Sequence, residues 1–144
     1  MKKMIDAKIN SIKELTTGLL KYADTFSFVL REENGISENA KVIISDLSIF
    51  LIEEKEVDEW PGTKLLLDQA KMFTFYLNPE SAFILSKHND NLHEWVQPNL
   101  PEDLVFYRDN QAVFVSITHE NDAYFELDEN AIDFLSKQGL LIIT

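Results

Sequence analysis

Apolar and polar residues alternate along several stretches of the sequence, and this alternation predicts β-strands. Phe26, Phe28 and Leu30 fall on one side of an extended chain, the pattern of a strand with one buried face. Four further strands are predicted, over residues 72–77, 104–108, 112–118 and 123–127. The second and third of these flank the turn-forming sequence Asp109-Asn110-Gln111, so we expect them to form a hairpin.

Apolar residues spaced three or four positions apart predict helices in the remaining stretches. Ser37, Asn78 and Asp128 stand where helix N-caps belong, because their side-chain oxygens can accept hydrogen bonds from the free N–H groups of a first turn. Gly139 is placed to end the last helix. The four predicted helices cover residues 4–22, 37–54, 78–96 and 128–138.

Residues 53–59 are mostly acidic, and we expect them to form the solvated end of the second helix. Pro61 and Gly62 would stop that helix, with Trp60 plugging the core. The predicted order of elements is α-β-α-β-α-β-β-β-α. Because the links between strands are tight, this order predicts an α+β fold, an antiparallel or mixed β-sheet with helices packed on it.

The length of 144 residues, without a linker or internal repeat, predicts a single domain over residues 1–144. The sequence has no cysteine, which excludes disulfides, thiolate metal sites and a cysteine nucleophile. No apolar stretch is long enough to span a bilayer. We therefore expect a cytoplasmic protein without a membrane partner.

The chain carries 25 acidic and 13 basic residues, a net charge of −12 at pH 7. Such a charge repels nucleic acid phosphates and anionic lipids, so we expect no nucleic acid partner. It favours a basic protein or a divalent cation. Solubility alone is the alternative explanation for an acidic composition.

The histidines do not form a recognisable metal motif. His88 and His93 are five residues apart, about 140° around a helix, whereas a zinc-binding helix of the His-Glu-x-x-His type needs a spacing of four. Glycine-rich phosphate-binding loops are also missing. We therefore expect no metal and no cofactor.

His119, Glu120 and Asp122 follow a predicted strand and form the strongest candidate for chemistry. A histidine beside carboxylates can act as a general base or as a pH-sensitive contact. No Gly-x-Ser-x-Gly motif surrounds the nearby Ser116. The alternative is a turn histidine that bonds a neighbouring carboxylate or the backbone.

Three strings carry a resemblance to a known family: Trp60-Pro61-Gly62-Thr63, Leu100-Pro101-Glu102-Asp103-Leu104-x-Phe106-Tyr107-Arg108 and Ser116-x-x-His119-Glu120. In these strings the chain resembles small bacterial proteins of unknown function, sometimes labelled stage III sporulation protein AH-like. The label implies a membrane-anchored assembly protein, and we do not carry that function over because the sequence shows no apolar anchor. The resemblance implies no catalytic residues.

Three functions remain open. The first is a non-catalytic cytosolic binding protein, in particular an acidic immunity-type inhibitor of a basic protein. The second is a small enzyme that uses His119 with Glu120 or Asp122, and the third is a structural protein that dimerises through an edge strand at residues 140–143. The residues expected at a binding surface are Trp60, Glu102, Asp103, Tyr107, Arg108, His119, Glu120 and Asp122.

Overall fold

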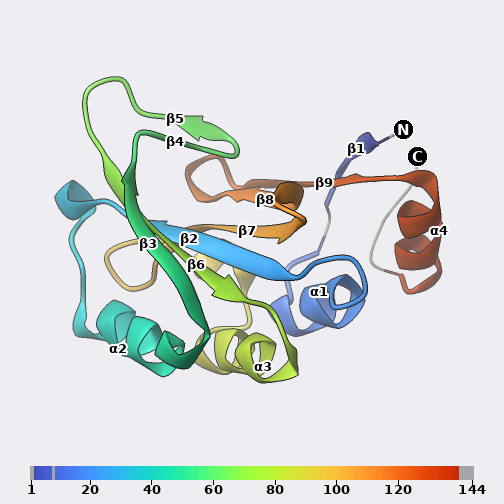
Figure 1. The fold of residues 1–144 in the computed structure, drawn as a ribbon, viewed down its shortest axis with the longest axis horizontal. Coiled ribbons are helices and arrows are strands. Elements are labelled where there is room, and N and C mark those ends of the chain that lie inside the picture. The colour runs from blue at the N-terminus through green and yellow to red at the C-terminus, as the bar shows by residue number, and fades with distance from the viewer. Residues whose placement is uncertain (1, 8, 140–144) are drawn as a thin grey trace.

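Seven strands form one antiparallel sheet in the computed structural model, which describes residues 2–7 and 9–139. The strand order is β1-β9-β8-β7-β2-β6-β3 (Figure 1). The strands are β1 (Lys3–Asp6), β2 (Thr25–Leu30), β3 (Leu51–Val57), β6 (Ala70–Tyr76), β7 (Glu102–Arg108), β8 (Gln111–Ile117) and β9 (Asp122–Leu127). The predicted α+β class is confirmed, and the predicted order of elements is broadly right.

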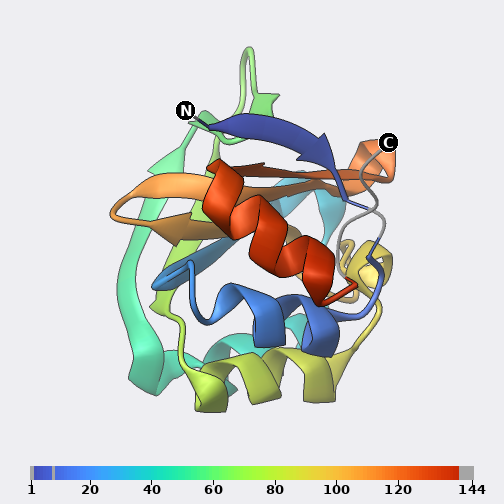
Figure 2. The same cartoon turned by 90° about the vertical axis from the view of Figure 1, so that its right-hand side faces the viewer.

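Four α-helices lie on one side of this sheet (Figures 1 and 2). They are α1 (Ile12–Leu19), α2 (Glu38–Asp46), α3 (Pro79–His88) and α4 (Glu129–Lys137). Short 3-10 turns follow or precede them: η1 (Glu32–Asn34), η2 (Ser48–Phe50), η3 (Leu92–Glu94) and η4 (Thr118–Glu120). The three predicted caps are confirmed, since the side chains of Ser37, Asn78 and Asp128 each accept a hydrogen bond from a first-turn N–H group.

Phenylalanine rings fill the space between the sheet and the helices. The Phe26 and Phe75 rings stack with centroids 5.2 Å apart, and the Phe114 and Phe125 rings meet edge to face at 5.0 Å. Alternation along the strands places these rings on one face, as the sequence predicts. Burial of this face supplies most of the stabilisation of the sheet, because each buried aromatic side chain removes a large apolar area from water.

A small hairpin covers part of the opposite face of the sheet. It consists of β4 (Glu59–Trp60) and β5 (Thr63–Lys64) (Figure 1). Trp60 is only 4% exposed and packs with Val29 and Ala70, so its predicted place in a core is confirmed. At the tip, Gly62 has a φ of +90° and lies so close to the sheet that an added Cβ would stand 2.8 Å from Ile117 Cγ1. Glycine is required there on both grounds.

The hairpin of β7 and β8 is confirmed, and its turn is tighter than expected. Asp109 and Asn110 both have positive φ values, 50° and 67°, as a two-residue type I′ turn needs. Gln111 already belongs to β8 and pairs with Arg108.

The predicted helix over residues 4–22 is wrong at its start. Residues Lys3–Asp6 form β1, which pairs with β9, and α1 begins only at Ile12 after the cap Ser11. Pairing with a strand about 120 residues away gives this short segment backbone partners that a helix pattern does not reveal.

The predicted second helix is also too long. It ends at Asp46, and residues 51–57 form β3 at one end of the sheet. The third helix ends at His88, before the buried Trp95. The predicted strand at residues 140–143 lies outside the described residues, and no helix in the described part is long and apolar enough to cross a membrane.

Candidate binding site

Glu102 and Asp103, expected on an exposed contact surface, are buried at the start of β7. Their exposed fractions are 0% and 1%. β7 lies between β8 and β2 in the middle of the sheet, so side chains of its first residues are covered on both sides. These two carboxylates therefore cannot contribute charge to a surface, and that part of the predicted contact surface is wrong.

Asp103 joins three separate segments through hydrogen bonds. Its Oδ1 accepts from the backbone N–H of Thr118 at 2.8 Å, and its Oδ2 accepts from Trp60 Nε1 at 2.9 Å. Its own N–H donates to Thr118 Oγ1 at 3.1 Å. Asp103 has a φ of +58° at a register shift between β2 and β7, a left-handed conformation that aspartate tolerates better than most residues.

Glu102 is the second buried carboxylate, and its partners differ from those of Asp103. Its Oε1 accepts from the backbone N–H of Gln97 at 3.0 Å. Its Oε2 lies 2.8 Å from His119 Nε2, and it has no well-angled hydrogen-bond donor among the described residues. The imidazole of His119 therefore lies against the buried carboxylate.

His119 is thus held by Glu102 and not by its sequence neighbours Glu120 or Asp122, which are exposed. Its side chain is 49% exposed. This arrangement agrees with a turn histidine that bonds a carboxylate. The enzyme hypothesis also requires a substrate cavity beside His119, and four cavities of the described part of the chain are lined by other residues.

Arg108 and Tyr107 stand at the far end of β7, about 20 Å from Glu102 for a strand of this length. Arg108 is exposed, and its Nη1 contacts the carbonyl oxygen of Lys21 at 3.5 Å. Tyr107 is half-buried and shares a hydrogen bond of 2.8 Å with Ser27. The predicted surface residues are therefore not brought together into one site.

Burial raises the pKa of the Tyr107 hydroxyl above its usual value of 10.0, and the hydrogen bond with Ser27 offsets part of this rise. Above pH 10 the unfolded chain releases this proton before the folded chain does, so the folded state loses stability as the pH rises from about 10 towards the folded pKa. We expect Tyr107→Phe to lose less of its unfolding free energy between pH 9 and pH 11 than the unsubstituted protein. Urea unfolding of both proteins at the two pH values measures this, and equal losses would contradict it.

A group of exposed acidic side chains lines the free side of β3 and the start of the small hairpin. We call it the acidic edge; it consists of Glu53, Glu54, Glu56, Asp58 and Glu59. Two of its members are paired, Glu53 with Lys55 and Glu54 with Lys71, each at 3.8 Å. The other three have no ion-pair partner in the described part of the chain.

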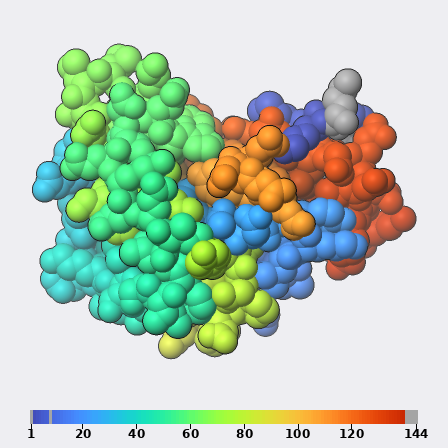
Figure 3. Space-filling model, viewed as in Figure 1, coloured from blue at the N-terminus to red at the C-terminus, as the bar shows by residue number. Residues whose placement is uncertain are grey.

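The acidic edge is continuous with an apolar loop. Leu66 and Leu67, between β5 and β6, are 89% and 96% exposed. In the space-filling view of Figure 3 the green surface from β3 to this loop occupies one side of the molecule. Residues 53–68 contain six acidic and two basic residues, a net charge of −4 that is a third of the total of −12.

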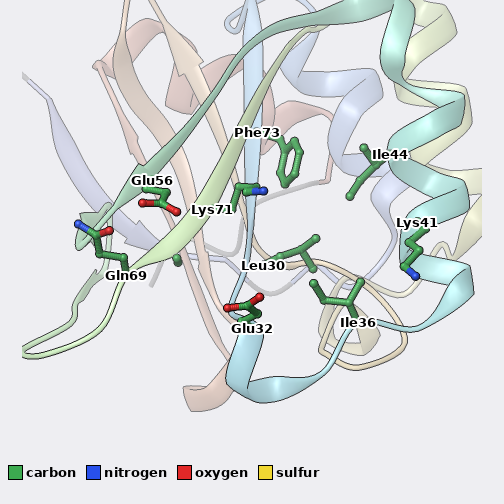
Figure 4. Close-up of a pocket in the computed structure, with 10 residues that line it drawn as sticks. Leu30, Glu32, Ile36, Lys41, Ile44, Glu56, Gln69, Lys71 and Phe73 are labelled. Atoms are coloured by element: carbon green, nitrogen blue, oxygen red, sulfur yellow. The ribbon is translucent and has the colours of Figure 1, made fainter.

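A cavity of about 280 Å³ opens beside the acidic edge, between α2 and the end of the sheet that carries β3 (Figure 4). We call it the α2 pocket. Its apolar lining consists of Leu30, Ile36, Ile44, Ala70 and Phe73. Its charged lining consists of Glu32, Lys41, Glu56 and Lys71.

Sequence reasoning missed this pocket because it assigned residues 53–59 to a helix end. Residues 51–57 carry no strand signal of their own, because the four consecutive charged residues 53–56 do not alternate with apolar ones. Pairing of β3 with β6 places Glu56 opposite Lys71, and this pairing brings Glu56 to the pocket.

His88 in α3 and His93 in η3 do not share a site. His88 Nε2 lies 2.8 Å from Asp46 Oδ2 and links α3 to α2, while His93 belongs to η3. Within residues 2–7 and 9–139 no cluster of three or more histidine or acidic side chains could hold a metal ion.

Comparison with known proteins gives no family model, curated protein or solved structure that matches the chain. The resemblance to the sporulation-labelled family therefore stays a prediction.

Proposed function

We propose that this chain is a non-catalytic cytoplasmic binding protein that covers a basic protein, in the manner of an inhibitor. The observation that carries the proposal is the acidic edge, in which Glu56, Asp58 and Glu59 are exposed and have no ion-pair partner among the described residues. Like charges that gather without partners raise the electrostatic energy of a free surface, and a basic partner relieves this repulsion. Such a surface also speeds and orients association.

The apolar loop supplies exposed apolar area that can be buried on binding, which the acidic residues alone do not. Leu66 and Leu67 expose nearly their whole side chains, and removal of such apolar area from water on binding is favourable. Charges on the edge strand β3 disfavour pairing with a further strand. The proposed contact is therefore made by side chains, with acidic residues for orientation and leucines for burial.

The test is capture of a partner by the immobilised protein from a lysate of its native cells. We expect a basic protein to be retained at low salt and released at high salt, because screening over about 10 Å at 0.1 M salt weakens exposed charge pairs. The triple variant Glu56→Gln, Asp58→Asn, Glu59→Gln is expected to lose the captured protein, as identified by mass spectrometry.

The matched control is Asp6→Asn, Glu14→Gln, Glu80→Gln. These three residues are exposed on β1, α1 and α3, and the substitutions change the net charge by the same amount. The control is expected to retain the captured protein. Equal loss from both variants would mean that only total charge matters, and retention of no basic protein by the unsubstituted chain would contradict the proposed function.

A further inference from the structure

The α2 pocket lies beside the acidic edge. Its size and its charged lining indicate a more specific contact than the exposed carboxylates of the edge do. Its volume of about 280 Å³ is below the roughly 300–1,000 Å³ of typical small-molecule sites. A cavity of this size suits one long side chain of a partner better than a cofactor. We propose that the α2 pocket receives an arginine side chain of the basic partner, an inference that rests on the proposed function.

The free charges around the pocket are negative. Lys41 lies 3.2 Å from Glu38, and Lys71 lies 3.8 Å from Glu54, so both lysines are already paired. Glu32 and Glu56 have no ion-pair or side-chain hydrogen-bond partner within the described residues. The four charged residues that line the pocket sum to zero, and Glu38 and Glu54, which lie outside the lining and pair with the two lysines, bring the local net charge to −2.

The floor of the pocket is apolar and suits the stem of such a side chain. Leu30 and Phe73 come from β2 and β6, and Ile44 comes from α2 (Figure 4). Arginine buries its aliphatic stem along apolar surface while its charged end stays at the rim. Glu32 and Glu56 approach the pocket from η1 and β3 (Figure 4), so carboxylates from two elements are available to the head group.

Arginine fits this rim better than lysine. Its planar guanidinium has five N–H donors and can bond two carboxylates at once, whereas an ammonium acts as a compact, strongly hydrated point charge. A guanidinium is also more easily removed from water, which suits a head group that lies between apolar floor and solvent. Lys71 opposes binding of arginine, because its positive charge repels the guanidinium.

The experiment titrates the protein with N-acetyl-arginine methylamide at low salt and follows backbone amide shifts by NMR. The control probe is the citrulline counterpart, which has nearly the same shape and no charge. We expect saturable shifts at Ile44 and Phe73 with the arginine probe in the millimolar range, as for a single side chain without the rest of an interface, and no saturable shifts with citrulline.

Three variants test whether the charged residues of the pocket bind the arginine probe. Glu32→Gln with Glu56→Gln is expected to weaken binding of the arginine probe about fivefold or more, and Lys71→Met to strengthen it about threefold, in line with exposed charge pairs. The control variant Asp6→Asn, Glu14→Gln, Glu80→Gln is expected to bind the probe within about twofold of the unsubstituted protein. Amide spectra without probe check that each variant is folded.

Absence of saturable shifts, equal shifts with citrulline, or an unchanged affinity in the Glu32 and Glu56 variant would each overturn the arginine proposal. Partner capture is measured separately. If the basic protein is still captured while the probe fails, the proposed function stands and the anchor lies outside the α2 pocket. If no basic protein is captured, the proposed function itself fails whatever the probe does.

Discussion

Replacement of Asp103 with alanine is expected to lower the free energy of unfolding by about 3–5 kcal/mol. The carboxylate accepts from Trp60 Nε1 and from the N–H of Thr118. Removal leaves one buried donor and one partly buried donor without an acceptor, at about 1–3 kcal/mol each. Alanine at a φ of +58° adds about 1 kcal/mol, because it keeps the Cβ of aspartate but lacks the polar side chain that makes aspartate tolerant of the left-handed region.

Two further substitutions separate these causes. Asp103→Asn keeps the size and the tolerance of a left-handed backbone but offers only one acceptor oxygen, so we expect a loss of about 1–2 kcal/mol. Asp103→Gly also removes both acceptors but relieves the backbone strain. We therefore expect it to lower the free energy of unfolding by about 1 kcal/mol less than Asp103→Ala does. Urea unfolding at pH 7 gives all three values. A loss below about 1 kcal/mol for alanine would show that water replaces the carboxylate at this position.

Features governed by short stretches of chain could be predicted from the sequence. The alternation of Phe26, Phe28 and Leu30 depends only on the two-residue repeat of a strand, and β2 forms as expected. The caps Ser37 and Asn78 act on N–H groups three residues away. The fold class follows from such elements because each must bury its apolar face against another.

Features governed by distant pairing could not be predicted in the same way. Glutamate and lysine favour helices in isolation, so residues 53–57 suggest a helix end. In the fold, β6 offers these residues backbone partners along one side of the strand, and an edge strand accepts charged side chains because its other side faces water. The α2 pocket, which requires β3, was hidden for the same reason.

The buried carboxylates escaped prediction because charged residues are usually exposed. Glu102 and Asp103 are buried only because their partners Gln97, Thr118 and Trp60 arrive from other segments. The flanking apolar residues Leu100 and Leu104, both fully or almost fully buried, were the one local sign that this stretch enters the core. Here two adjacent acidic residues between apolar neighbours belong to a buried polar network and not to an exposed surface.

Replacement of Trp60 with alanine is expected to cost about 3–5 kcal/mol, as is usual for a buried tryptophan. Trp60 is the largest side chain of the small cluster with Val29 and Ala70, its N–H bonds Asp103, and the Arg31 guanidinium lies 5.2 Å from its ring centre. It is the main contact that fixes the hairpin of β4 and β5 to the sheet. Loss of the ring should therefore release the hairpin before the rest of the fold.

Trp60→Phe is the matched comparison, because phenylalanine keeps an aromatic ring but removes the N–H donor. We expect it to cost about 1–3 kcal/mol, since it leaves one oxygen of Asp103 buried without its donor. Amide hydrogen exchange measures where the effect lies: in Trp60→Ala, Leu65 should lose protection much more than Phe28. The N–H of Leu65 bonds the carbonyl oxygen of Asp58 across the hairpin, whereas Phe28 lies within the central strand β2. Uniform loss of protection at both sites would mean that the hairpin unfolds only with the whole sheet. Local loss would mean that this single ring holds Asp58, Glu59 and the exposed leucines in place, as the proposed binding surface requires.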